Sequence, residues 1–199
     1  MKRSIITIIA LLIVGSIAGA AVAATITQTL AWPSDTRTLI LPFGYSYPVH
    51  NVRHVKMIVW RDTGITLAAP AGSMVYAAED GIVQSIITPD SMHPYGSVII
   101  EHTDATVSAG KYTTFYSGVV GVLPAVGSTV YKGNYIATVQ DFGTVTLGLV
   151  TELHFGVRNT PYDNNMLAGT RSLPSIAMTL YGLPAFPDNY IDPVTVLLP

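Results

Sequence analysis

The sequence predicts an all-β fold with an antiparallel core sheet and a second, smaller sheet. Many short runs are rich in Val, Ile, Thr and Tyr, and Gly or Pro bounds most of them. Outside the N-terminal segment, only residues 175–181 are compatible with a helix, and that helix would be short. Short strands separated by turn residues are typical of antiparallel β domains.

The expected strands follow one another with little sequence between them. The first lies at 55–60 and the last at 151–157, and residues 159–190 are loop-like apart from the short helix. Six further strands are expected at 73–77, 81–88, 96–102, 111–116, 129–131 and 135–140. Glycines stand between these runs, where tight turns need a positive φ or a close approach of two backbones.

Residues 1–23 have the character of a targeting segment. Lys2 and Arg3 precede an apolar run at 5–14, and small residues at 21–23 offer a cleavage site. The segment is also long enough to span a bilayer, so a cleaved signal peptide and a retained membrane anchor are both open. Either interpretation predicts an extracytoplasmic protein that is secreted or attached to the membrane by this segment.

The rest of the chain divides into a lead-in at 24–54, which contains several prolines, and one domain at 55–199. This length is sufficient for a full hydrophobic core. The formal charge of the chain is −2, and removal of Lys2 and Arg3 would make it −4 (−2 − 2). No cluster of basic residues is present, which argues against nucleic acid as a partner. The absence of cysteine excludes disulfides and thiolate metal sites.

The most informative motif is ELHF at 152–155. Side chains alternate along a strand, so Glu152 and His154 share one face and the two apolar residues share the other. A second motif, RDTGITLAAPAGSMVYAAEDGIV, occupies residues 61–83. The sequences YGSVIIEH at 95–102 and FYSGVVGVLPAVGSTVYKGNYIATVQ at 115–140 lie between the two motifs.

In this order and spacing, the motifs resemble the lysostaphin/LytM-type zinc metallopeptidases, a family of peptidoglycan endopeptidases. The resemblance covers about residues 60–158. It implies an antiparallel β-sheet domain of the duplicated-hybrid-motif type. It also implies a substrate class, the peptide crosslinks of a cell-envelope polymer.

The resemblance further implies where a zinc site would lie. In the family, zinc is held by the His and Asp of H-x-G-x-D and by the second His of H-x-H, and a fourth position is open for water. In this chain the three ligand positions are filled by Asp62, Thr66 and His154. Glu152 replaces the first His of H-x-H, and Gly118 replaces the His of a Y-x-H motif beside the water.

These replacements identify the chain as a degenerate member that lacks most of the zinc and catalytic residues. Thr66 is a poor zinc ligand because its hydroxyl is neutral, and Gly118 has no group that transfers protons. We expect no bound cofactor, and a polar cleft in which Asp62 or Glu152 hydrogen-bonds to His154. The alternative is a zinc site built from Asp62, Glu152 and His154, in which Glu152 is the catalytic base.

Other polar residues have structural interpretations that we favour over functional ones. His50 and His54 have i, i+4 spacing in a segment without helical character, His93 lies in a loop between prolines, and His102 ends a strand. Six tyrosines are candidates for lining a glycan or peptide groove: Tyr45, Tyr47, Tyr95, Tyr112, Tyr116 and Tyr131.

The sequence therefore predicts an exported, non-catalytic LytM-like domain that binds cell-envelope polymer or regulates a partner wall enzyme. One alternative is an active metallopeptidase with an altered ligand set, and another is a structural surface module. The changed ligand set argues against the enzyme, and the polar pair Glu152 and His154 argues against a purely structural strand. We expect Asp62, Thr66, Glu152 and His154 to meet at one end of the sheet.

Overall fold

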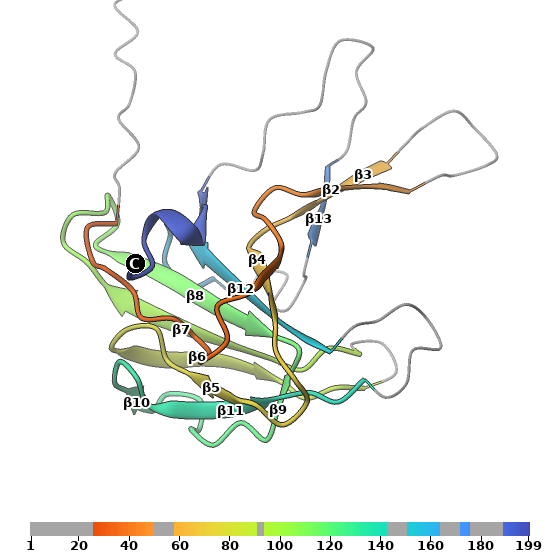
Figure 1. Cartoon of the computed structure of the whole chain (residues 1–199). Helices are drawn as coiled ribbons and strands as arrows, with labels where there is room; N and C mark the ends of the chain where they lie inside the picture. Colours follow the sequence, from red (N-terminus) through yellow and green to blue (C-terminus); the bar gives the residue numbers. More distant parts are fainter. Residues whose placement is uncertain (1–25, 50–57, 91–93, 143–150, 164–171, 176–188) are drawn as a thin grey trace, which may run out of the picture.

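The computed structural model of the chain describes the residues at 26–49, 58–90, 94–142, 151–163, 172–175 and 189–199. In this part of the chain the strands form three sheets, and the single helix is the 3₁₀ helix η1 (Pro193–Thr195) (Figure 1). The predicted all-β class with a small second sheet is confirmed. The described residues include no helix with the length and apolar character needed to cross a bilayer.

The main sheet has eight strands in the order β1-β4-β12-β8-β7-β6-β10, and β14 also pairs with β12. The strands are β1 (Leu39–Leu41), β4 (Ile65–Ala68), β6 (Gly81–Ile87), β7 (Ser97–Thr103), β8 (Lys111–Ser117), β10 (Thr129–Val130), β12 (Glu152–Arg158) and β14 (Tyr190–Ile191). All named pairs in this sheet are antiparallel. The central strand β12 is buried along almost its whole length.

Two smaller sheets accompany the main sheet. One contains β5 (Met74–Tyr76), β11 (Tyr135–Val139) and β9 (Val119–Val120), and the other contains β13 (Ser172–Ser175), β3 (Ile58–Asp62) and β2 (Ser46–Val49). Figure 1 shows the β13-β3-β2 sheet projecting beyond the main sheet, on the side away from β5 and β11.

The core lies on one face of the main sheet. Ile65, Phe155, Tyr116 and Val98 are successive register partners on four neighbouring strands, and all four are fully buried. Burying large apolar side chains in this way is the main favourable term in folding. The N-terminal part of the described chain joins the same core, because Leu30 is fully buried and forms a parallel bridge with Leu197.

Seven of the eight expected strands appear as β5, β6, β7, β8, β10, β11 and β12, each within about two residues of the predicted bounds. The eighth, expected at 55–60, corresponds to β3, although 55–57 lie outside the described residues. Of the helix expected at 175–181, Ser175 is instead the last residue of β13, and the remainder lies outside the described residues, as does the targeting segment at 1–23.

The sequence analysis missed β1, β2, β4, β9, β13 and β14. The omission of β4 matters most, because this strand carries Thr66 into the centre of the main sheet. Ile65, Thr66 and Leu67 are all fully buried, and the strand has only four residues, so its apolar–polar alternation is too short to be recognised.

Replacing Gly64 with alanine will destabilise the domain far more than replacing an exposed turn glycine. A Cβ at Gly64 would overlap the backbone of Phe155, whereas a Cβ at Gly72 would meet no atom within 4 Å. We expect Gly64→Ala to lower the free energy of unfolding by about 3 kcal/mol, and Gly72→Ala by about 1 kcal/mol through its φ of +77°. Chemical denaturation measures both, and equal losses would contradict the packing argument.

Candidate functional site

Three of the four residues expected to meet do so at one nitrogen of His154. The Oδ1 atom of Asp62 lies 3.3 Å from Nδ1 of His154. The hydroxyl of Thr66 forms a 3.3 Å hydrogen bond with the same Nδ1 atom. The three positions at which the family holds zinc are therefore adjacent in space.

Local backbone contacts explain why Asp62 reaches this place. Its N–H donates to the carbonyl of Tyr45, and its carbonyl accepts from the N–H of Gly44, both at 2.9 Å. The chain then turns through Thr63 and Gly64 into β4, and the turn packs directly on the backbone of β12. These contacts hold Asp62, the last residue of β3, next to the imidazole of His154.

Burial controls the protonation state of His154. Its side chain is 2% exposed, and those of Asp62 and Thr66 are fully buried. Burial lowers the pKa of His154 to about 3, because the imidazolium form would lose its hydration. We therefore describe the imidazole as neutral and its approach to Asp62 as a close polar contact rather than an ion pair. The Nε2 atom has no hydrogen-bond partner among the described residues.

His154 belongs to a row of polar side chains that crosses four strands. In the sheet register Thr66 is opposite His154, His154 is opposite Ser117, and Ser117 is opposite Ser97. All four are at most 2% exposed, and the hydroxyl of Ser97 donates to that of Ser117 at 3.0 Å. The sequence analysis missed both serines. One sequence feature could have identified them, because each serine lies beside a glycine, Gly96 or Gly118, at the end of a strand.

Glu152 and Gly118 occupy the two acid–base positions of the family. Glu152 lies on β12 two residues before His154, so both side chains leave the same face of the strand, and it is 5% exposed. Gly118 has a φ of +82°, and a Cβ there would lie 2.6 Å from the carbonyl oxygen of Glu152. This backbone conformation strongly disfavours any side chain at the position of the Y-x-H histidine.

The residues present do not fit the zinc site of the resembled family. Protein zinc sites use thiolate, imidazole and carboxylate ligands, and here a hydroxyl, that of Thr66, stands in one of the three positions. The described residues contain no group of three His, Cys, Asp or Glu side chains that could hold a metal ion. Glu152 thus does not complete such a group with Asp62 and His154. The catalytic role considered for Glu152 stays a prediction.

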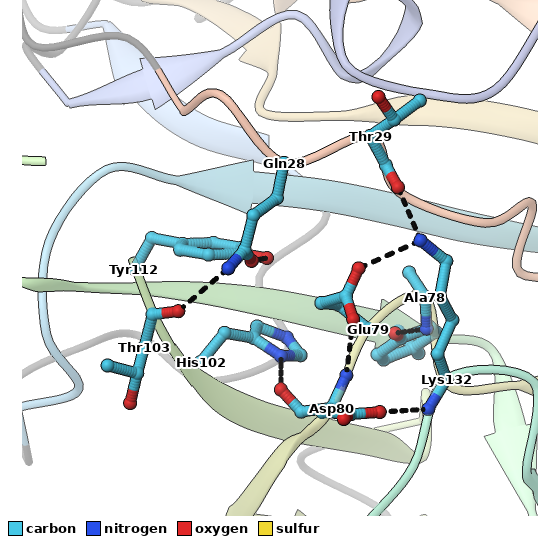
Figure 2. A network of polar contacts seen from close by, with 10 residues as sticks. Gln28, Thr29, Ala78, Glu79, Asp80, His102, Thr103, Tyr112 and Lys132 are labelled. Atoms are coloured by element: carbon cyan, nitrogen blue, oxygen red, sulfur yellow. Dashed lines mark hydrogen bonds and ion pairs between the residues drawn. The ribbon is translucent and has the colours of Figure 1, made fainter. Parts of the chain in front are cut away.

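His102 has a structural environment that is separate from the site. Its Nδ1 atom lies 2.8 Å from the carbonyl oxygen of Asp80 (Figure 2). Its Nε2 atom lies 2.7 Å from the hydroxyl of Thr114. Its ring stacks on Tyr112, and burial lowers its pKa to about 4. Lys132 joins the same region by bonding Glu79 and the carbonyl of Thr29, as Figure 2 shows.

The structure divides the remaining candidate residues into four groups. Tyr112 and Tyr116 are fully buried in the core, so they cannot line a groove, while Tyr45 and Tyr131 are 44% and 60% exposed. Tyr95 packs on Phe142 at a ring separation of 5.1 Å. The residues without a described side chain are His50, His54, His93 and Tyr47.

The fold combines a large antiparallel sheet with a smaller second sheet, and a carboxylate, a hydroxyl and an imidazole meet at the site. Residues 61–166 match Peptidase family M23, which is just over half of the chain. The chain belongs to this family.

Comparison with solved structures gives similar folds. A zinc-containing peptidase from Vibrio cholerae is 30% identical, with a TM-score of 0.49, over 68% of this chain and 39% of that chain. Csd3 from Helicobacter pylori is 24% identical, with a TM-score of 0.45, over 74% of this chain and 36% of that chain. The catalytic domain of lysostaphin from Staphylococcus simulans is 16% identical, with a TM-score of 0.42, over 66% of this chain and 86% of that domain.

This chain therefore spans well under half the length of the first two proteins. No curated protein matches the sequence.

The two buried histidines should make the domain unstable in mild acid. In the folded chain the pKa is about 3 for His154 and about 4 for His102, below the ordinary value of 6.5. Between these values and pH 6.5, the two histidines bind protons in the unfolded chain but stay neutral in the folded chain. This contribution is fully present above pH 6.5 and is lost as the pH falls towards 4. We expect His102→Asn and His154→Asn each to remove about 1.4 kcal/mol per pH unit from the slope near pH 5. Urea titrations at several pH values would contradict this if the slopes stayed equal.

Proposed function

We propose that this M23 domain is exported and non-catalytic, and that it binds cell-envelope polymer or regulates a partner wall enzyme. The observation that carries the proposal is the set of atoms around Nδ1 of His154, a carboxylate from Asp62 and a hydroxyl from Thr66. A hydroxyl cannot replace a ligating carboxylate in a stable zinc site. No metal-activated water would then be available for peptide hydrolysis.

Gly118 supports the same conclusion independently. Peptide cleavage by the family uses a histidine at this position, and the positive φ of Gly118 disfavours one. To gain peptidase activity, the chain would therefore need both the family's zinc ligands and its acid–base histidine. Residues that act as a catalytic unit are strongly non-additive, so loss of several leaves little activity.

The binding part of the proposal rests on the surface beside the site and on the N-terminal segment. Tyr45 is 44% exposed, and its carbonyl is the group that accepts from Asp62. Leu39 and Ile40 on the edge strand β1 are 43% and 39% exposed. An exposed tyrosine with apolar neighbours offers both stacking and hydrogen bonding to a polymer. The targeting segment at 1–23 would deliver the domain to the envelope.

The purified full chain should bind isolated envelope polymer without cleaving it. We expect cosedimentation with the polymer, no chelator-sensitive release of amino groups, and well under one zinc per chain by elemental analysis after dialysis. Tyr45→Ala should weaken cosedimentation at least threefold, whereas Tyr131→Ala, which also removes an exposed tyrosine, should not.

One tightly bound zinc per chain that is lost in His154→Ala, together with chelator-sensitive cleavage, would instead establish an active metallopeptidase with an altered ligand set. Absence of both binding and cleavage would favour a structural surface module.

Restoring the ligands should be easier than restoring the acid–base group. Asp62→His with Thr66→Asp places three ordinary zinc ligands at positions that already adjoin Nδ1 of His154, so we expect about one zinc per chain. Adding Glu152→His and Gly118→His should not give cleavage, because any side chain at residue 118 meets the carbonyl of Glu152.

We expect Gly118→His alone to lower the free energy of unfolding by about 2 kcal/mol through its unfavourable φ. Zinc content and denaturation measure the two effects separately. A variant that carries all four changes and cleaves the polymer would show that the turn at Gly118 can rearrange.

A further inference from the structure

An apolar groove lies where β6 ends, away from the atoms that surround Nδ1 of His154. Its volume is about 280 Å³. The lining residues come from the end of β6 and from the chain that follows Gly118, and they are Ile86, Ile87, Thr88, Pro89, Val119, Val120, Gly121 and Val122. None of these side chains is ionisable, so the groove suits uncharged, apolar groups.

One wall of the groove is an unpaired strand edge. In the described part of the chain, β10 pairs with β6 only at its first two residues, and the backbone of Val83 then bonds to Gly127 and Ser128. Ser85, Ile86 and Ile87 pair with β7 on one edge, and among the residues that the structure describes no strand pairs with them on the groove side. Their outward N–H and C=O groups are therefore available to a further strand.

The opposite wall is formed by β9 and the residues after it. β9 is the edge strand of the β5-β11-β9 sheet, and β11 pairs with only one of its edges. On its other edge the N–H of Val119 donates to the carbonyl of Gly96 at 3.1 Å. The loop at 121–126 then continues the apolar surface, with Leu123 66% exposed and Val126 59% exposed.

We propose that this groove is a docking site for an extended polypeptide segment of a partner protein, which adds a strand to the free edge of β6. An unpaired strand edge presents a row of amide donors and acceptors, and a polypeptide backbone supplies the complementary row. Glycans and lipids lack such a regular row of amides.

The lining also indicates the sequence of that segment. Alternate side chains of a strand point the same way, so an aliphatic residue at every second position would enter the groove. The register irregularity between Val83 and Ser85 limits pairing at one end, and Pro89 limits it at the other. The docking segment is therefore short, about four or five residues.

Beyond the register irregularity between Val83 and Ser85, the edge lacks the usual protection against such pairing. Natural edges are commonly blocked by Lys, by proline within the strand or by charged side chains that point inward. Residues 84–88 read Gln-Ser-Ile-Ile-Thr and contain none of these. An exposed edge without charges, beside an apolar groove, is suited to β-strand addition.

The test titrates the purified full chain with an acetylated, amidated hexapeptide that alternates valine and threonine. We expect amide NMR shifts to concentrate at 84–87 and 119–122, and N-methylation of alternate peptide bonds to weaken binding at least tenfold. Thr88→Lys, at an exposed position, and Ile87→Lys should weaken binding at least tenfold. Met74→Lys is the control, because Met74 is 54% exposed and lies outside the groove.

Three results would overturn the proposal. The N-methylated peptide binding as tightly would show that no strand is added. Shifts confined to other strands, or no binding at millimolar peptide, would show that the groove does not accept an extended segment. A dimer in sedimentation that Thr88→Lys dissociates would identify the occupant as a second copy of this chain. The zinc content and the polymer binding are measured independently of these outcomes. The docking proposal can therefore be wrong while the proposed function holds, and the reverse is also true.

Discussion

The close approach of the β3–β4 turn to β12 is the constraint on which the site depends. Gly64 lies directly on the backbone of Phe155, and no Cβ could be accommodated there. The contact lies at the start of the pairing between β4 and β12, in which Thr66 is opposite His154. It also holds the end of β3, which belongs to a different sheet, so that Asp62 reaches the same imidazole nitrogen. A single glycine contact thus joins two sheets at the site.

The departures from the family pattern are of two physical kinds. At residues 62 and 66 the side chains are Asp and Thr, and both still lie against Nδ1 of His154. At Gly118 the backbone itself differs from what a histidine needs. Its N–H donates to Gly96 and its carbonyl accepts from Gln140, and these bonds hold the passage from β8 to the small sheet. Gly118 thus has a structural role in connecting the two sheets.

Most of the fold could be predicted from the sequence because glycines and Val/Ile/Tyr runs mark most of the strands. β4 could not, since its four residues, Ile-Thr-Leu-Ala, alternate between apolar and polar only over the first three, which is too short for the pattern to be recognised. Asp62, Thr66 and His154 were found through spacing and resemblance alone. The depressed pKa of His154 and its link to Ser117 could not be read from the sequence, because both depend on which strands become neighbours in the sheet.

The polar row argues against a purely structural sheet. A buried imidazole nitrogen without a hydrogen-bond partner costs about 1–3 kcal/mol, and Nε2 of His154 has none among the described residues. An apolar residue opposite Thr66 and Ser117 would avoid that cost. Proteins retain such local conflicts mainly at functional sites, where other demands outweigh stability. The row also ends at Ile87, the register partner of Ser97, which lines the apolar groove. The histidine and the strand edge beside the groove therefore lie along one register line of the same sheet, with Ser117 and Ser97 between them.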